Sequence, residues 1–148
     1  MALDSDVQIW ATAISTNANS GRKIIFRYAK QLSATFDRAS QPIRIIIVWK
    51  YQSDSGQPNA EDHQRMNLLE DTLEPVLNGD RFATLALVST GEDLREWTYY
   101  ARSENEFIVR LDRAFAGTPA FPIEIHAAWD PSWEMYEQFK AGVREVAS

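Results

Sequence analysis

The strand pattern at residues 43–51 (IRIIIVWKY) constrains the fold of this chain more than any other feature of its sequence. The middle of this segment is apolar at consecutive positions, so both faces of such a strand must be covered. A strand of this kind belongs in the interior of a sheet. We therefore expect residues 43–51 to form a central strand with other elements packed on both of its faces.

A helix is predicted directly after the polar loop that follows this strand. Asn59 is a good N-cap, and Asp62 lies three residues later in the first turn. Pro75 is expected to kink or tighten the last turn. Apolar residues recur at helical spacing along residues 60–77, namely Met66, Leu69, Leu73, Val76 and Leu77. This spacing predicts a helix with one buried face.

A hairpin and a second helix are predicted next. Residues 82–90 and 94–101 are strand-like and are joined by the tight turn at residues 91–93. Ser103 and Glu106 then form an S-x-x-E capping box, which is typical of a helix start. The helix is expected to end at Gly117. Residues 121–129 alternate apolar and polar side chains and therefore predict a further strand with one buried face.

Residues 43–129 therefore read strand, helix, strand, strand, helix, strand. This order predicts an α+β fold with a ferredoxin-like βαββαβ antiparallel sheet. An N-terminal hairpin at about 7–28 and a C-terminal helix at about 131–146 are added to it, with Asp130 as N-cap and Pro131 at N1. Residues 29–42 are expected to form an irregular connection. The whole chain, 1–148, is predicted to be a single domain with its core at about 43–129.

Composition excludes several classes of function. The 21 acidic and 15 basic residues give a net charge of −6, and no basic stripe is present, so nucleic acid is an unexpected partner. No apolar run approaches the roughly 20 residues of a membrane helix. Residues 1–6 carry two acids and no base, unlike a secretory signal, so a cytoplasmic location is expected. The chain contains no cysteine, which removes thiolate chemistry.

No motif in the sequence indicates a cofactor or a metal. The H-E-x-x-H, G-x-S-x-G, P-loop, G-x-G-x-x-G and EF-hand patterns do not occur. His63 follows Glu61 and Asp62, but adjacent helical positions point in different directions and do not converge on one ion. We therefore expect no cofactor and no metal site.

Two sets of residues are candidates for a site. Glu124 and His126 share the polar face of the last strand and could form an acid–base couple, with Arg102 as a nearby cation. The second set is aromatic. Trp97 and Tyr99 share one face of a strand and Tyr100 lies on the other, while Trp129, Trp133 and Tyr136 bracket the junction at residues 130–132. These rings either fill the core and pin the last helix to the sheet, which the sequence favours, or form an exposed surface for a partner.

Several segments resemble a known family. They are the strand ending in Val48-Trp49, the Leu-rich helix before Asn78-Gly79, the W-x-Y-Y strand that begins at Trp97, and the D-x-x-W-x-x-Y segment from Asp130 to Tyr136. Over residues 43–139 the chain resembles the bacterial family known as domain of unknown function 695. That family is similar in architecture to the regulator of ribonuclease activity B, which implies a protein-binding role by analogy. The family has no established catalytic residues.

Acidic charge, abundant aromatic residues and missing catalytic motifs together predict a small binding or regulatory module whose partner is another protein. The alternative is a cofactor-free enzyme or small-ligand binder with a cleft near Glu124, His126 and Arg102. A homodimer is a third expectation, because an open sheet face or an exposed edge strand has to be covered.

Overall fold

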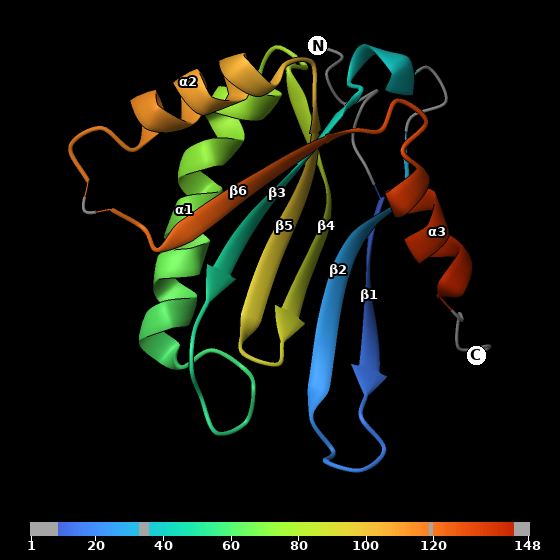
Figure 1. Cartoon of the computed structure of the whole chain (residues 1–148), viewed down its shortest axis with the longest axis vertical. Coiled ribbons are helices and arrows are strands. Elements are labelled where there is room, and N and C mark those ends of the chain that lie inside the picture. The colour runs from blue at the N-terminus through green and yellow to red at the C-terminus, as the bar shows by residue number, and fades with distance from the viewer. Residues whose placement is uncertain (1–8, 33–35, 119, 144–148) are drawn as a thin grey trace.

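The computed structural model describes residues 9–32, 36–118 and 120–143, and within them the chain forms one six-stranded sheet and three α-helices (Figure 1). Neighbouring strands are all antiparallel, in the order β1-β2-β4-β5-β3-β6. The strands are β1 (Ile9–Thr16), β2 (Lys23–Gln31), β3 (Ile43–Lys50), β4 (Ala83–Gly91), β5 (Leu94–Ala101) and β6 (Ile123–Trp129). The helices are α1 (Ala60–Asn78), α2 (Glu104–Ala114) and α3 (Glu134–Gly142). The mixed α+β class predicted from the sequence is thus confirmed.

Helix α2 was expected to end at Gly117 but ends at Ala114. Apart from this end and the start of α3, the predicted strands and helices match these elements closely, and two details of the sheet differ. The first concerns β3, which is an interior strand but lies beside the edge strand β6, while β4 and β5 occupy the middle of the sheet. The second concerns residues 29–31, which were expected in an irregular connection and instead extend β2, because they continue its pairing with β1. The rest of that connection contains a short 3₁₀ turn at Arg38–Ser40.

Local capping explains where two of the helices begin. The side-chain oxygen of Asn59 accepts a hydrogen bond from the amide of Asp62 at 2.8 Å, and α1 begins at the next residue, Ala60. The hydroxyl of Ser103 likewise accepts from the amide of Glu106 at 3.2 Å, and α2 follows. Both predicted N-caps are therefore confirmed.

The main core lies between the sheet and the pair α1 and α2, which pack together on one face (Figure 1). Ile45, Ile47 and Trp49 point to this face at alternate positions of β3. The helices contribute fully buried side chains to the same cluster, namely Met66, Leu69, Leu73, Leu77 and Phe107. Strand alternation and helical periodicity therefore meet in one hydrophobic layer.

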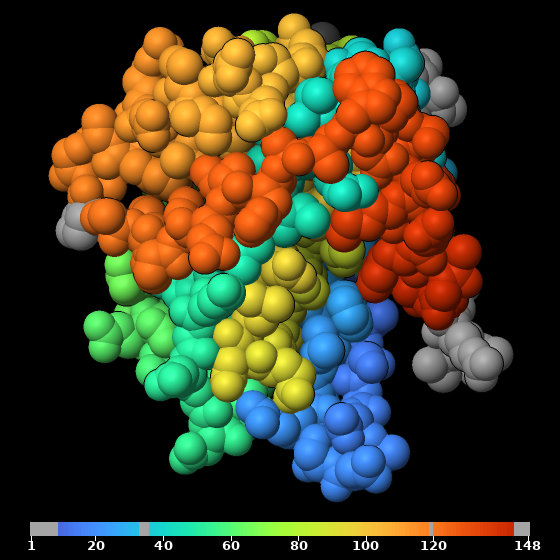
Figure 2. All heavy atoms as spheres, in the orientation of Figure 1, coloured from blue at the N-terminus to red at the C-terminus, as the bar shows by residue number. Residues whose placement is uncertain are grey.

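Helix α3 covers part of the opposite face, which Figure 2 shows in front. The ring of Trp133 stacks on Tyr100 with 4.2 Å between centroids and 9° between planes, and its Nε1 donates to the carbonyl of Gln41 at 3.0 Å. The hydroxyl of Tyr136 donates to the carbonyl of Ala29. The D-x-x-W-x-x-Y segment therefore docks α3 onto the sheet.

The predicted start of this last helix is wrong by three residues. Asp130 and Pro131 were expected at N-cap and N1, but α3 begins at Glu134, and Trp133 precedes it with a left-handed φ of 57°. Asp130 still helps the first turn, because its Oδ1 accepts from the amide of Glu134 at 2.8 Å. The helix ends at Gly142, and the predicted positions 144–146 lie outside the described residues.

Candidate functional site

A groove lies between α1 and the β1–β2 hairpin, on the same face of the sheet as α1 and α2. Arg27 points to this face, because its guanidinium reaches Glu70 of α1. Thr12 is paired with Arg27, and Ile14 with Ile25, so these side chains share that face. Trp10 lies two residues before Thr12 and points the same way. Trp10, Ile14 and Ile25 remain exposed, and Trp10 and Ile25 each line a hollow beside the helix.

The wall of the groove is one face of α1. The α1 residues that line it recur at intervals of one to four positions, as helical neighbours do, and they are His63, Asn67, Glu70, Glu74, Leu77 and Asn78. Two hollows of about 150 Å³ and about 450 Å³ lie along this wall, and both are lined by Arg27 and Glu70. From His63 to Asn78 the helix rises by about 22 Å. The two hollows adjoin at Arg27 and Glu70, whose ion pair links the hairpin to α1 at their boundary, and together they are called the groove.

A compact polar cluster lies at the centre of the groove. Oε1 of Glu70 accepts a hydrogen bond from a terminal nitrogen of Arg27 at 2.6 Å and another from Nε1 of Trp97 at 2.9 Å. A terminal nitrogen of Arg95 lies 3.6 Å from the same oxygen. Two guanidinium groups and one indole therefore converge on a single carboxylate oxygen.

Burial and charge act on this carboxyl in opposite directions. Burial disfavours the ionised form of Glu70, but the hydrogen bond and charge of Arg27, the Trp97 donor and the charge of Arg95 outweigh it, so its pKa is lowered. Tyr99, which also lines the smaller hollow, is fully buried, and its pKa is raised by burial and by the negative charge of Glu70. Glu70 is therefore an anion at neutral pH, and Tyr99 is a neutral phenol.

Arg95 is the least satisfied group in the groove. Arg95 is 5% exposed and lines the larger hollow. Its guanidinium carbon lies 5.0 Å from the centre of the Trp97 ring. Burial and then the positive charge of Arg27 lower its pKa, while Glu70 acts in the opposite direction. Its Nε is buried without a hydrogen-bond partner. A buried charged donor of this kind is costly unless something accepts from it.

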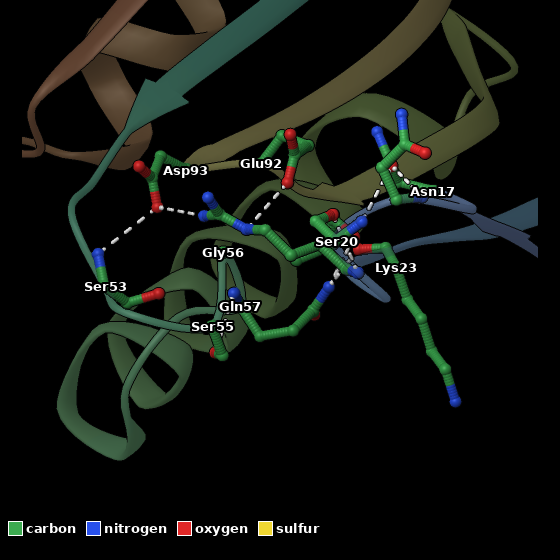
Figure 3. Close-up of polar contacts among 12 residues, drawn as sticks. Asn17, Ser20, Lys23, Ser53, Ser55, Gly56, Gln57, Glu92 and Asp93 are labelled. Atoms are coloured by element: carbon green, nitrogen blue, oxygen red, sulfur yellow. Dashed lines mark hydrogen bonds and ion pairs between the residues drawn. The ribbon is translucent and has the colours of Figure 1, made fainter.

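Loops at the end of the sheet hold the hairpin beside this wall (Figure 3). The side-chain amide of Gln57, which lines the larger hollow, donates to the carbonyls of Lys23 at 2.8 Å and Thr90 at 3.1 Å. Nε of Arg22 lies 2.9 Å from Glu92 of the β4–β5 turn. Figure 2 shows this turn, in yellow, beside the hairpin, in blue, whose end extends beyond it. The end of the groove is thus fixed by contacts among three loops.

The aromatic residues proposed from the sequence divide into two groups. Trp97, Tyr99 and Trp133 are buried, so their rings are parts of the two cores and not of an outer surface. Trp129, at the end of β6, is 71% exposed. Of this set, Trp97 and Tyr99 take part in the groove, Trp97 through its indole nitrogen and Tyr99 as a lining residue.

Glu124 and His126 lie on the exposed face of β6. Oε2 of Glu124 is 3.6 Å from Nε2 of His126, and Nζ of Lys50 lies 3.7 Å from the same carboxylate oxygen. Arg102 is held elsewhere, because it donates to the carbonyls of Asp80 and Arg81. The hollows that we describe are lined by other residues, so a cleft near these three residues stays a prediction.

The sequence did not single out Arg27, Glu70 or Arg95. The available signals were a charged residue inside the apolar strand β2 and an acidic residue beside the apolar face of α1. Neither signal indicates which side chains contact one another in the fold.

Among the described residues, no cluster of three or more His, Cys, Asp or Glu could hold a metal ion, and no helix is long and apolar enough to cross a membrane. The arrangement is suited to binding, because it offers donors, a partly free cation and apolar contact area.

Comparison with known proteins finds a match to the profile of a family of unknown function, DUF695, over residues 8–140. This match spans β1 to α3 and includes every residue of the groove. No curated protein matches the chain.

Proposed function

Since the chain belongs to the family of unknown function DUF695, we propose from the groove itself that the protein is a binding module, and that the groove between α1 and the β1–β2 hairpin holds an extended segment of a partner protein. The observation that supports this proposal is that the two hollows adjoin at Arg27 and Glu70 and follow one face of α1. Their lining is apolar at Trp10 and Ile25 and polar along the helix.

The dimensions of the groove support a peptide segment as its occupant. A wall of about 22 Å accommodates about seven residues of extended chain. Small-molecule sites are concave and bury most of the surface of one compact ligand, whereas the lining here follows most of the length of α1. Exposed apolar side chains at Trp10, Ile14 and Ile25 offer contact area for alternate side chains of such a segment.

The chemistry of the groove supports binding over catalysis. The carboxylate of Glu70 is already engaged by Arg27 and Trp97. The phenol of Tyr99 is held neutral by burial, so it is a poor base. A regulatory role through a protein partner and a cytoplasmic location, both expected from the sequence, are part of this proposal.

We further propose that β3 to β6, with α1 and α2, form a ferredoxin-like core to which the hairpin and α3 are added. Two observations support this assignment. The strand order β6-β3-β5-β4 places the first and third strands of the βαββαβ unit in its middle, and all pairs are antiparallel. The hairpin extends the sheet beyond α1, and this extension creates the groove.

A library of random eight-residue peptides tests the proposed function. The peptides are selected for binding to the wild-type chain and then measured on Asn67→Trp, which places a large ring in the groove, and on Leu68→Trp, which adds a ring at an exposed position outside it. We expect at least about tenfold weaker binding to Asn67→Trp and unchanged binding to Leu68→Trp. Equal binding to both variants, or no selectable peptide, would overturn the proposal.

A further inference from the structure

Within the groove, Arg95 lines the larger hollow with a guanidinium that is not fully paired. The contacts of Arg27, Arg95 and Trp97 with Glu70 all go to one of its oxygens, Oε1. Nε of Arg95 has no acceptor at all. Native proteins pair nearly all such buried groups, so an unpaired one that lines a hollow indicates a missing acceptor.

The charges around this hollow also indicate that a negatively charged acceptor is missing. It is lined by the cations Arg27 and Arg95 and by one anion, Glu70, which leaves one positive charge in excess. Glu74 lines the smaller hollow, not this one. The neutral lining residues Thr12, Asn67 and Thr90 add further polar side chains. An anionic group is the complement of such a lining.

We propose that this hollow is a carboxylate subsite, and that it takes the side chain of an aspartate or glutamate within the bound segment. The identity of the occupant rests on the proposed function, whereas the preference for a carboxylate rests on Arg95. Guanidinium groups bind carboxylates strongly because their N–H groups match the two oxygens.

The position of the subsite favours a residue inside the segment over its free C-terminus. Arg27 and Glu70 line both hollows, so the groove continues on both sides of this point. A terminal carboxylate placed here would leave one of the two hollows empty. An internal acidic side chain allows the segment to occupy both.

Two pools of capped eight-residue peptides test the subsite. Both pools lack Asp and Glu at all positions except the fifth, which is Glu in one pool and Gln in the other, and both termini are blocked. Affinities are measured for the wild-type chain and for Arg95→Met, which retains an unbranched apolar side chain over Trp97. We expect the wild-type chain to prefer the Glu pool by about tenfold or more, and Arg95→Met to show no preference.

The outcomes separate the two proposals. Binding of both pools with equal affinity to the wild-type chain, still sensitive to Asn67→Trp, overturns the carboxylate subsite and leaves the peptide groove standing. Binding of neither pool overturns the carboxylate subsite, and selection from the random library then decides whether the peptide groove stands. If sodium acetate or inorganic phosphate alone binds at the hollow and no pool does, the site belongs to a small free anion, and the internal acidic residue is overturned.

A second variant, Arg27→Met, keeps the test decisive if Arg95→Met does not fold. Arg27→Met changes a side chain that is 38% exposed and lies at the surface of the groove. Folding of both variants is checked by circular dichroism. We expect Arg27→Met to reduce the preference for the Glu pool as well. If both variants fold and both keep the preference of the wild-type chain, the subsite is overturned.

Discussion

Nε1 of Trp97 donates a hydrogen bond of 2.9 Å to Oε1 of Glu70, so an indole whose ring is completely buried in the main core contacts the centre of the groove directly. The two residues lie 27 positions apart in sequence, on β5 and α1. Through this bond the packing of the core fixes the orientation of the carboxylate. The groove is therefore attached directly to the main core.

Removing the charge of Glu70 should destabilise the chain. Glu70→Gln leaves Arg27 and Arg95 without their anion, and we expect the free energy of unfolding to fall by about 2 kcal/mol, less than for a fully buried pair because the Glu70 side chain is 21% exposed. Urea denaturation measures the difference. Glu74→Gln, at an exposed position of the same helix, should change stability by less than about 0.5 kcal/mol, and a similar loss in both variants would contradict the role of the cluster.

The contribution of Glu70 should depend on pH in a defined direction. Its pKa in the folded chain is lowered from the ordinary value of 4.5, so the unfolded chain takes up the proton first as the pH falls. The stabilisation is complete above that value and is lost as the pH falls from about 4.5 through the lower folded pKa. The stability difference between wild type and Glu70→Gln should therefore shrink below about pH 4.5. A difference that grows with acidity would contradict the lowered pKa.

The two helices at the main core could be predicted from the sequence because their signals are local. Asn59 and Ser103 cap their helices through residues three positions away. The start of α3 could not be predicted, because Trp133 adopts its left-handed φ while its ring stacks on Tyr100, a contact across 33 residues of chain.

The groove lay beyond prediction for the same physical reason. Arg27 and Glu70 are 43 residues apart, and they meet only because β2 pairs with β4, a pairing that no local pattern specifies. Sequence periodicity did indicate that Trp97 and Tyr99 share one strand face, and the structure places both on the core side. Which charged residues face them depended on the placement of the hairpin.

The exposed and the buried tryptophan near α3 should respond differently to truncation. Trp133→Ala removes a ring that is 0% exposed and stacked on Tyr100, so we expect a loss of about 3–5 kcal/mol in the free energy of unfolding. Trp129→Ala, at 71% exposure, should cost less than about 0.5 kcal/mol. Chemical denaturation compares them, and a large loss in Trp129→Ala would show that its ring has a structural role.

A methyl group at Gly91 should separate β2 from the β4–β5 turn. A Cβ at this position would lie 2.4 Å from the carbonyl oxygen of Lys23 and 2.8 Å from Cα of Ile24, and both contacts are with backbone. We expect Gly91→Ala to destabilise the chain by about 1–3 kcal/mol. Gly142→Ala is the matched control, because a Cβ there meets nothing within 4 Å and alanine favours the helix. Thermal unfolding that shows no loss for Gly91→Ala would contradict the close approach.

The most direct test of the groove is an NMR titration of the tryptophan indole N–H signals with a peptide selected from the random library. We predict that the signals of Trp10, which lines the groove, and Trp97, which is bonded to Glu70, shift together as the peptide binds. The signal of Trp133, on the opposite face of the sheet, should stay in place. Saturable binding that shifts Trp133 or Trp129 and leaves Trp10 and Trp97 unchanged would contradict the account.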